Sequence, residues 1–301
     1  MNDLIILGGG PAGLTSATYA IRKRLNVLLI SPDLGGKTRF HMYLPDNLER
    51  FQVITGEDMV NRFKSQVEYL EFVRTLDRAE KVEPIEGGYA VKTAQGNRYE
   101  ARAIIVATGT GPVKLGVPGE DKYRLHGLAY SAVSYAPLFI DRTTAVVGEG
   151  ELGVRSALEL AQIARQVYFI VPSLAVLETP MGAKLRAADN VTVLDGYQVK
   201  EVKGDDTYAH SIVVTKGGED VDLTVDVTFV ELDLLPHSEC VADLVQLNAK
   251  RQIVVNCNNR TSRPGIFAAG DVTDTFGEQV LICIGEGAKA ALGAFEYILA
   301  L

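Results

Sequence analysis

The stretch Leu4-Ile5-Ile6-Leu7-Gly8-Gly9-Gly10-Pro11-Ala12-Gly13 decides the fold of this 301-residue chain. The apolar run Leu4–Leu7 predicts a buried strand, and the Ala-rich segment that follows the glycines, up to Lys23, predicts a helix. The apolar residues between Leu25 and Ile30 predict a second strand. A glycine-rich turn between strand and helix in such a βαβ unit is typical of a dinucleotide-binding fold.

Each glycine of this turn has an expected role. Gly8 permits the tight turn, Gly10 lets the backbone approach a pyrophosphate, and Gly13 lets the helix pack on the strand. The helix N-terminus would direct unpaired N–H groups at the phosphates. The acid expected at the end of the second strand, for a ribose hydroxyl, is replaced by Ser31, with Asp33 two residues later.

A second strand, glycine turn and helix follow later in the chain. Thr144–Val147 predicts the strand, and Val154–Arg165 and Gln166–Val171 predict the helix and the next strand. Two such units indicate two doubly wound, Rossmann-like α/β domains of three layers each. The second nucleotide site is predicted at Gly148, Gly150 and Gly153.

Composition and charge narrow the class of protein. With 30 basic and 38 acidic residues the formal net charge is −8, so binding to nucleic acid is not expected. No apolar stretch approaches the roughly 18 residues of a membrane span, and no signal peptide is expected. Cys240, Cys257 and Cys283 show no metal-ligand spacing, which predicts no metal site and fits a reducing, cytoplasmic location.

The order and spacing of these motifs resemble those of low-molecular-weight thioredoxin reductases, which are FAD flavoproteins. The resemblance covers nearly the whole chain, and its end is similar to the related alkyl-hydroperoxide-reductase flavoproteins. The residues that carry it are Gly8–Gly13, Gly35-Gly36, Ala107-Thr108-Gly109, Gly148–Gly153, Ala268–Asp271 and Gly285–Ala291.

The resemblance implies an FAD domain, residues 1–112 and 243–301, interrupted by an inserted pyridine-nucleotide-type domain, residues 113–242. It implies one FAD per chain, with Asp271 near the ribityl or pyrophosphate region and the Gln279-Val280 backbone at the flavin pyrimidine edge. It also implies a homodimer. The expected FAD-binding residues are Gly8, Gly10, Pro11, Ala12, Gly13, Ser31, Gly35, Gly36, Lys37, Asn47, Ala107, Thr108, Gly109, Gly270, Asp271, Gln279 and Val280.

Two departures from the family pattern bear on function. Ser131 and Ser134 stand where thioredoxin reductases carry their CxxC, and a serine hydroxyl cannot cycle through a disulfide. Serines that only hydrogen-bond locally are the simpler interpretation. Val171-Pro172-Ser173 replaces the His-Arg-Arg that holds the NADPH 2′-phosphate, and Glu149 and Glu151 add carboxylates to the second glycine loop. That loop is either a degenerate nucleotide site or a scaffold turn.

The catalytic residues are not identified by the sequence, but two side chains are candidates for the flavin surroundings. Lys37 follows Gly35-Gly36 where the family usually has Gln, and an amine beside the isoalloxazine would favour the reduced flavin. A solvated surface lysine is the alternative. Cys283 lies one turn from Gln279 on the expected last helix, where it approaches the flavin or is simply part of the core.

The sequence therefore predicts an FAD-dependent oxidoreductase without a dithiol, fed by ferredoxin, flavodoxin or a second bound flavin. The alternatives are an NADH-linked flavin or quinone-type reductase and a non-catalytic FAD-binding redox sensor. The carrier or second flavin is expected between the two domains. A ferredoxin would need a basic docking patch, for which the candidates are Arg22, Lys23, Arg24, Lys37 and Arg39.

Overall fold

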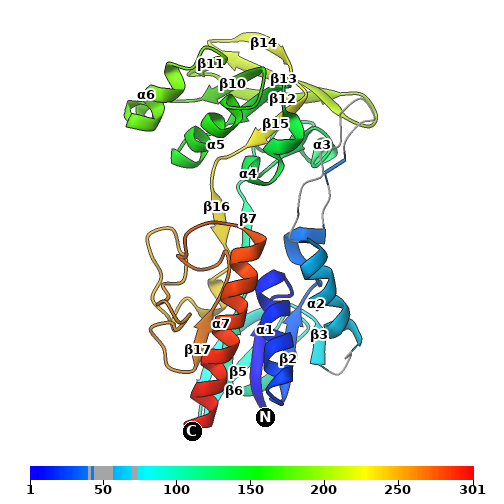
Figure 1. The fold of residues 1–301 in the computed structure, drawn as a ribbon, viewed down its shortest axis with the longest axis vertical. Coiled ribbons are helices and arrows are strands. Elements are labelled where there is room, and N and C mark those ends of the chain that lie inside the picture. Colours follow the sequence, from blue (N-terminus) through cyan, green and yellow to red (C-terminus); the bar gives the residue numbers. More distant parts are fainter. Residues whose placement is uncertain (40–41, 44–56, 70–72) are drawn as a thin grey trace. The chain divides into compact units, whose positions relative to one another are not determined.

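The computed structural model describes residues 1–39, 42–43, 57–69 and 73–301 of the chain. It contains two compact units (Figure 1). The first comprises Met1–Arg39, the described part of Thr55–Gly111, and Leu235–Leu301, and the second comprises Pro112–Leu234 together with Met42 and Tyr43. The prediction of two α/β domains, one inserted in the other, is confirmed as a fold class.

The first unit is built on a parallel sheet that starts with the predicted strand. β1 (Asn2–Leu7) lies between β2 (Val27–Ser31) and β6 (Arg98–Val106). β3 (Arg74–Leu76) extends the sheet beyond β2, and β17 (Ile266–Ala268) pairs with β6. The resulting order β3-β2-β1-β6-β17 is that of a doubly wound nucleotide-binding sheet.

The apolar run in β1 is explained by burial on both faces of this sheet. Leu4 and Ile6 belong to one core and Ile5 and Leu7 to another, because successive side chains of a strand point to opposite faces. The second core is closed by an antiparallel extension of β6. Its strands are β5 (Gly88–Thr93) and β4 (Ala79–Ile85).

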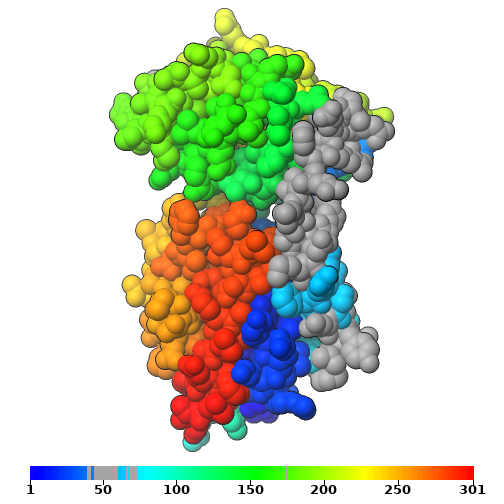
Figure 2. All heavy atoms as spheres, viewed as in Figure 1, coloured from blue at the N-terminus to red at the C-terminus, as the bar shows by residue number. Residues whose placement is uncertain are grey.

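Helices close the first core. α1 (Pro11–Arg22) and α7 (Val280–Leu299) lie side by side, and their atoms form a continuous blue and red surface in Figure 2. A Cβ on Gly287 would lie 2.2 Å from the Ala12 carbonyl oxygen, so only glycine allows this close approach. The Ser16 hydroxyl donates to the Gly287 carbonyl oxygen at 2.9 Å. The remaining helices of the unit are α2 (Glu57–Tyr69), η1 (Gly36–Arg39) and η5 (Glu239–Val241).

The second unit repeats this design. Its parallel sheet has the order β11-β10-β9-β15-β8, with helices over one face and a three-stranded antiparallel sheet, β12-β13-β14, over the other. The parallel strands are β8 (Leu128–Ala129), β9 (Thr143–Val147), β10 (Gln166–Val171), β11 (Val191–Asp195) and β15 (Val227–Val230). The antiparallel strands are β12 (Gln198–Gly204), β13 (Ala209–Lys216) and β14 (Glu219–Thr224). The helices are α3 (Glu120–Tyr123), α4 (Ala132–Tyr135), η3 (Ala136–Phe139), α5 (Glu151–Ala161), η4 (Leu174–Glu178) and α6 (Pro180–Arg186).

The chain passes between the units through β7 (Thr110–Pro112) and β16 (Leu234–Pro236), which pair with each other. Contacts divide the chain after Gly111 and after Leu234. The return boundary lies before residue 243 because Cys240 and Val241 belong to the core of the first unit. The domain boundaries expected from the sequence, after residues 112 and 242, describe units that fold together, and they stay predictions. Among the described residues, no helix is long and apolar enough to cross a membrane.

Candidate functional site

The first glycine loop combines close backbone packing with an open position. A Cβ on Gly13 would lie 1.8 Å from the Gly8 carbonyl oxygen, and Gly8 itself has φ +107°. A Cβ on Gly10, by contrast, would have no neighbouring atom within 4 Å. Gly10 also precedes α1 as its N-cap and provides no side-chain cap. Open space at an uncapped helix N-terminus, where backbone N–H groups lack intrahelical partners, suits a phosphate group.

Ser31 shapes this loop from the end of β2. Its buried hydroxyl accepts a hydrogen bond of 2.7 Å from the Gly9 N–H. Gly9, which had no role predicted from the sequence, is also required sterically, because its Cβ would lie 2.3 Å from the Asp33 carbonyl oxygen. Ser31 is therefore a loop-positioning residue in the structure, and its contact with a ribose stays a prediction.

A second pair of glycines is held against the first loop. Gly35 (φ +103°) donates its N–H to the Gly9 carbonyl oxygen at 2.7 Å. A Cβ on Gly36 would lie 3.0 Å from the Gly10 Cα. Lys37 is the next residue in the chain, so its backbone lies beside the open position at Gly10.

Lys37 is exposed, with 49% of its side chain accessible to water, and it is paired with a carboxylate. Its Nζ donates to the Thr110 hydroxyl at 2.6 Å and to Asp271 Oδ2 at 2.8 Å. The other carboxylate oxygen of Asp271 accepts a hydrogen bond from the Cys283 thiol, with an Sγ–Oδ1 distance of 3.2 Å. Hydrogen bonds thus link residues from four segments of the first unit, and Thr110, which binds Lys37, is a member that sequence reasoning missed.

Ala107-Thr108-Gly109 lies at the carboxyl end of β6. The Ala107 N–H donates to the Leu7 carbonyl oxygen at 2.7 Å, so this segment lines the same edge of the sheet as the first loop. The Thr108 hydroxyl donates to the His237 carbonyl oxygen at 2.6 Å. Gly109 adopts φ +68°, and a Cβ there would meet nothing within 4 Å.

The Gly270-Asp271 turn and the start of α7 lie close together. Gly270 has φ +78°, and a Cβ there would lie 3.3 Å from Cys283 Sγ. Gln279 is the N-cap of α7, which begins at Val280, and its side chain makes no capping bond. The N–H groups of the first turn of a 20-residue helix therefore provide the positive end expected at the flavin pyrimidine edge.

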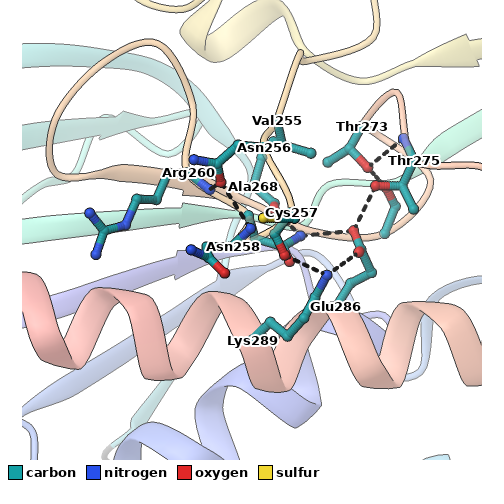
Figure 3. A network of polar contacts seen from close by, with 12 residues as sticks. Val255, Asn256, Cys257, Asn258, Arg260, Ala268, Thr273, Thr275, Glu286 and Lys289 are labelled. Carbon is teal, nitrogen blue, oxygen red and sulfur yellow. Dashed lines mark hydrogen bonds and ion pairs between the residues drawn. The ribbon is translucent and has the colours of Figure 1, made fainter.

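A buried carboxylate fixes α7 to this turn (Figure 3). Glu286 Oε2 accepts hydrogen bonds from Asn259 Nδ2 at 2.8 Å and from the Thr275 hydroxyl at 3.0 Å. Asn259 Nδ2 also donates to the Ala268 carbonyl oxygen, at the end of β17. Lys289, one turn along the helix, lies 3.2 Å from Glu286 Oε1. The network joins the strand that precedes Asp271 to the helix behind it.

Replacement of Glu286 by alanine is expected to destabilise the fold by roughly 1–3 kcal/mol, because it leaves one of the two N–H groups of the buried Asn259 amide without a partner. The measurement is the free energy of unfolding in urea. Glu296→Ala on the same helix is the control: its carboxylate is 72% exposed and 3.6 Å from Arg260, so its loss changes the free energy by less than about 0.5 kcal/mol. Equal effects of the two substitutions would contradict the assignment.

The second glycine loop keeps the backbone geometry of the first. A Cβ on Gly148 would lie 2.6 Å from the Gly153 Cα, whereas one on Gly150, the N-cap of α5, would meet nothing within 4 Å. Its charge differs, however. Besides Glu149 and Glu151, the buried Glu231 lies at the carboxyl end of β15, where its Oε1 accepts the Ala132 N–H at 2.6 Å. Glu231 was not predicted from the sequence, because nothing in its local pattern marks it.

The residues at the expected dithiol position form a local cap. Ser131 is the N-cap of α4 and accepts the Ser134 N–H at 3.3 Å, and the two hydroxyl oxygens are 2.9 Å apart. Ser173, at the position of the family's phosphate-binding arginines, likewise caps η4 by accepting the Ala175 N–H at 3.4 Å. In the structure, the Ser131 and Ser173 side chains cap helix N-termini by accepting backbone N–H groups.

Two of the cysteines are buried, and two other residues singled out from the sequence lie wholly or partly outside the described residues. Cys240 and Cys283 are buried, which raises the pKa of the Cys240 thiol to about 12 and also raises the pKa of Cys283. No cluster of potential metal ligands occurs among the described residues. Asn47 lies outside the described residues, as does the side chain of Arg39.

The expected basic docking patch would extend along α1 and stays a prediction, because the side chain of Arg39 lies outside the described residues. Arg22, Lys23 and Arg24 lie at the C-terminal end of α1, whereas Lys37 lies beside its N-terminal end. A helix of 12 residues separates these ends by about 18 Å. Lys37 is also engaged by Asp271.

Comparison with known proteins is consistent with this geometry. The family model described as pyridine nucleotide-disulphide oxidoreductase matches residues 2–287. The chain belongs to this family. Among solved structures, the family member from Streptococcus pyogenes MGAS5005, a thioredoxin reductase, is 30% identical with a TM-score of 0.90, covering 100% of this chain and 99% of that one. The predicted resemblance to thioredoxin reductases is confirmed, and the chain is a thioredoxin-reductase-like member of an oxidoreductase family.

Two further proteins are similar to nearly the whole chain. An alkyl hydroperoxide reductase component of Staphylococcus aureus strain MSSA476 is 34% identical over 302 residues, 99% of this chain and 59% of that protein. The chain thus spans less than two thirds of the length of this relative. A ferredoxin-flavin thioredoxin reductase from Clostridium acetobutylicum is 25% identical with a TM-score of 0.51, covering 99% of this chain and 98% of that one.

Proposed function

We propose that this chain is an FAD-dependent oxidoreductase that receives electrons from a carrier other than NADPH and uses no cysteine pair of its own. The observation that carries the proposal is the Ser131–Ser134 cap at the dithiol position. A hydroxyl pair cannot store two electrons as a thiol pair does. The acceptor must therefore take electrons from the flavin directly.

The first unit fits FAD on its own geometry. The open position at Gly10, beside an uncapped helix, suits the pyrophosphate, and Asp271 and the α7 N-terminus suit the ribityl chain and the pyrimidine edge. Bound FAD would supply an electron acceptor that takes one or two electrons. The Gly35-Gly36 loop and the segment Ala107–Gly109 would enclose it at the carboxyl edge of the parallel sheet.

Charge at the second loop disfavours NADPH. Glu149 and Glu151 flank Gly150 in the loop where a dinucleotide pyrophosphate would bind, and the backbone oxygen of the buried Glu231 lies 3.2 Å from a Cβ on Gly148 in the same loop. Carboxylates there would repel the pyrophosphate. Pro172 and Ser173, not arginines, come directly after β10, where the family holds the 2′-phosphate in a bidentate contact. A one-electron carrier, either ferredoxin or flavodoxin, or a second bound flavin, is the donor that this arrangement supports. The similar protein from Clostridium acetobutylicum, which has ferredoxin and flavin in its name, supports the proposal of such a donor.

One observation favours a second candidate, an NADH-linked flavin or quinone-type reductase. Gly150 keeps the open position of a phosphate cradle, and Gly148 and Gly153 keep the close approach behind it. NADH lacks the 2′-phosphate for which the chain has no clamp.

The resemblance to thioredoxin reductases also leads us to propose a homodimer.

Anaerobic titration of the purified yellow protein tests the proposal. Reduced ferredoxin, reduced flavodoxin, NADH and NADPH are added in turn, and bleaching of the visible flavin band is followed. We expect bleaching by a reduced carrier protein within seconds and none by NADPH. Rapid bleaching by NADH alone would establish the second candidate. Protein that binds FAD but is bleached by none of these donors would leave the redox sensor, and bleaching by NADPH would overturn the proposal.

A further inference from the structure

An ion pair lies where the expected flavin-contacting segments converge. Lys37, from the Gly35-Gly36 loop, is 2.8 Å from Asp271 Oδ2 and 2.6 Å from the Thr110 hydroxyl. Cys283, from α7, donates to the other oxygen of the same carboxylate. Both side chains that contact the Asp271 carboxylate thus come from segments that border the expected FAD site.

The exposure of the two partners differs in a way that matters for charge. The Asp271 side chain is 13% exposed, whereas that of Lys37 is 49% exposed. A carboxylate so shielded from water, close to a flavin, disfavours the addition of negative charge to that flavin. The lysine ammonium offsets this effect at short range. Lys37 alone would be a cation, but the pair has no net charge.

We propose that Lys37 is a positioning residue that sets the flavin reduction potential by neutralising Asp271. The inference rests on the proposed binding of FAD in the first unit. Lys37, itself held by the Thr110 hydroxyl, binds the carboxylate opposite Cys283 and cancels its charge. Without Lys37, Asp271 is an unpaired anion beside the flavin, and the reduced flavin becomes harder to form.

The experiment measures the midpoint potential of bound FAD by spectroelectrochemistry in four proteins, together with the FAD dissociation constant. The proteins are the wild type, Lys37→Gln, Asp271→Asn and the double variant. Lys37→Gln is expected to lower the potential and Asp271→Asn to raise it, because the first leaves an anion and the second a cation. The double variant, again without net charge, is expected to return close to the wild-type potential.

Two further variants separate this role from a general effect of charge. Lys37→Arg keeps the positive charge and should keep the potential close to the wild-type value. Lys92→Gln removes a lysine that is equally exposed, at 50%, and paired with Glu83 at 3.0 Å, but on the antiparallel extension of the sheet. It should leave the potential unchanged. If Asp271→Asn does not retain FAD, the comparison of Lys37→Gln, Lys37→Arg and Lys92→Gln still decides the outcome.

The results distinguish the inference from the proposed function. Wild-type protein that takes up no FAD would overturn the proposed function. With FAD bound, a Lys37→Gln potential equal to that of the wild type would overturn the inference alone. A double variant that keeps the Lys37→Gln potential would do the same, since the charge of Asp271 would then not reach the flavin.

Discussion

Gly10→Glu is expected to yield a folded but colourless protein that retains no FAD. A Cβ at Gly10 meets no protein atom within 4 Å, so we expect the fold to accept a side chain there. The new carboxylate, however, lies at the N-terminus of α1, where the cofactor phosphates would bind, and it both fills the space and repels them. We expect the FAD affinity to fall by roughly 100-fold or more, about 3 kcal/mol. The measurement is the flavin absorbance per chain after purification, with circular dichroism to establish folding.

The second glycine loop provides a matched control for this substitution. Gly150 is also the N-cap of a helix and also has open space around its Cβ position, but it lies in the second unit. Gly150→Glu should therefore leave FAD bound. Gly13→Ala differs from both, since its Cβ would overlap the Gly8 carbonyl oxygen at 1.8 Å, and it should reduce stability as well as FAD content. Yellow Gly10→Glu protein with wild-type flavin content would contradict the assignment of the site.

The second large effect expected is the absence of NADPH-driven disulfide reduction, both in the wild type and after the cysteines are restored. Ser131→Cys/Ser134→Cys supplies two thiols at the dithiol position, but the chain still lacks a phosphate clamp after β10 and keeps the buried Glu231 near the second loop. Turnover of an aromatic disulfide reagent through thioredoxin should stay far below the 1 to 10³ per second typical of enzymes, to order of magnitude.

A second assay on the same double variant separates electron transfer from the flavin to the cysteine pair from reduction of the flavin by NADPH. With the flavin reduced chemically in the absence of oxygen, electron transfer to the new cysteine pair is measured as thiol formation after a single turnover, without any need for NADPH. Thiol formation in that assay, combined with no turnover on NADPH, would locate the defect at the hydride donor. NADPH-driven turnover at enzymatic rates, in either protein, would refute the prediction.

Much of the fold and part of the site were accessible from the sequence. The strand, glycine turn and helix at residues 4–23 obey local rules, since a short apolar strand buried on both faces and a turn that excludes side chains leave few alternatives. The same rules identified the second unit. The absence of a dithiol was equally accessible, because it depends on residue type at Ser131 and Ser134 and not on their surroundings.

Contacts between distant segments could not be inferred in this way. Lys37 and Asp271 are 234 positions apart, and Glu286 and Asn259 are brought together only when α7 packs beside the loop before β17. Glu231 follows an ordinary buried strand, and only the folded sheet places it near the Gly148–Gly153 loop. The sequence also does not show that α1 separates Arg22–Arg24 from Lys37, so the extent of the predicted basic patch depends on the fold.

The sequence by itself determined the class of fold, the position of both glycine loops and the presence of serines at the dithiol position, because each follows from local sterics or from residue type alone. Only the tertiary structure decided the charge balance of the site. Whether Lys37 is a free cation or half of a neutral pair depends on which carboxylate the fold brings within hydrogen-bonding distance. The reason is physical: the energy of a charge is set by its neighbours and its exposure to water, and both are properties of the folded chain.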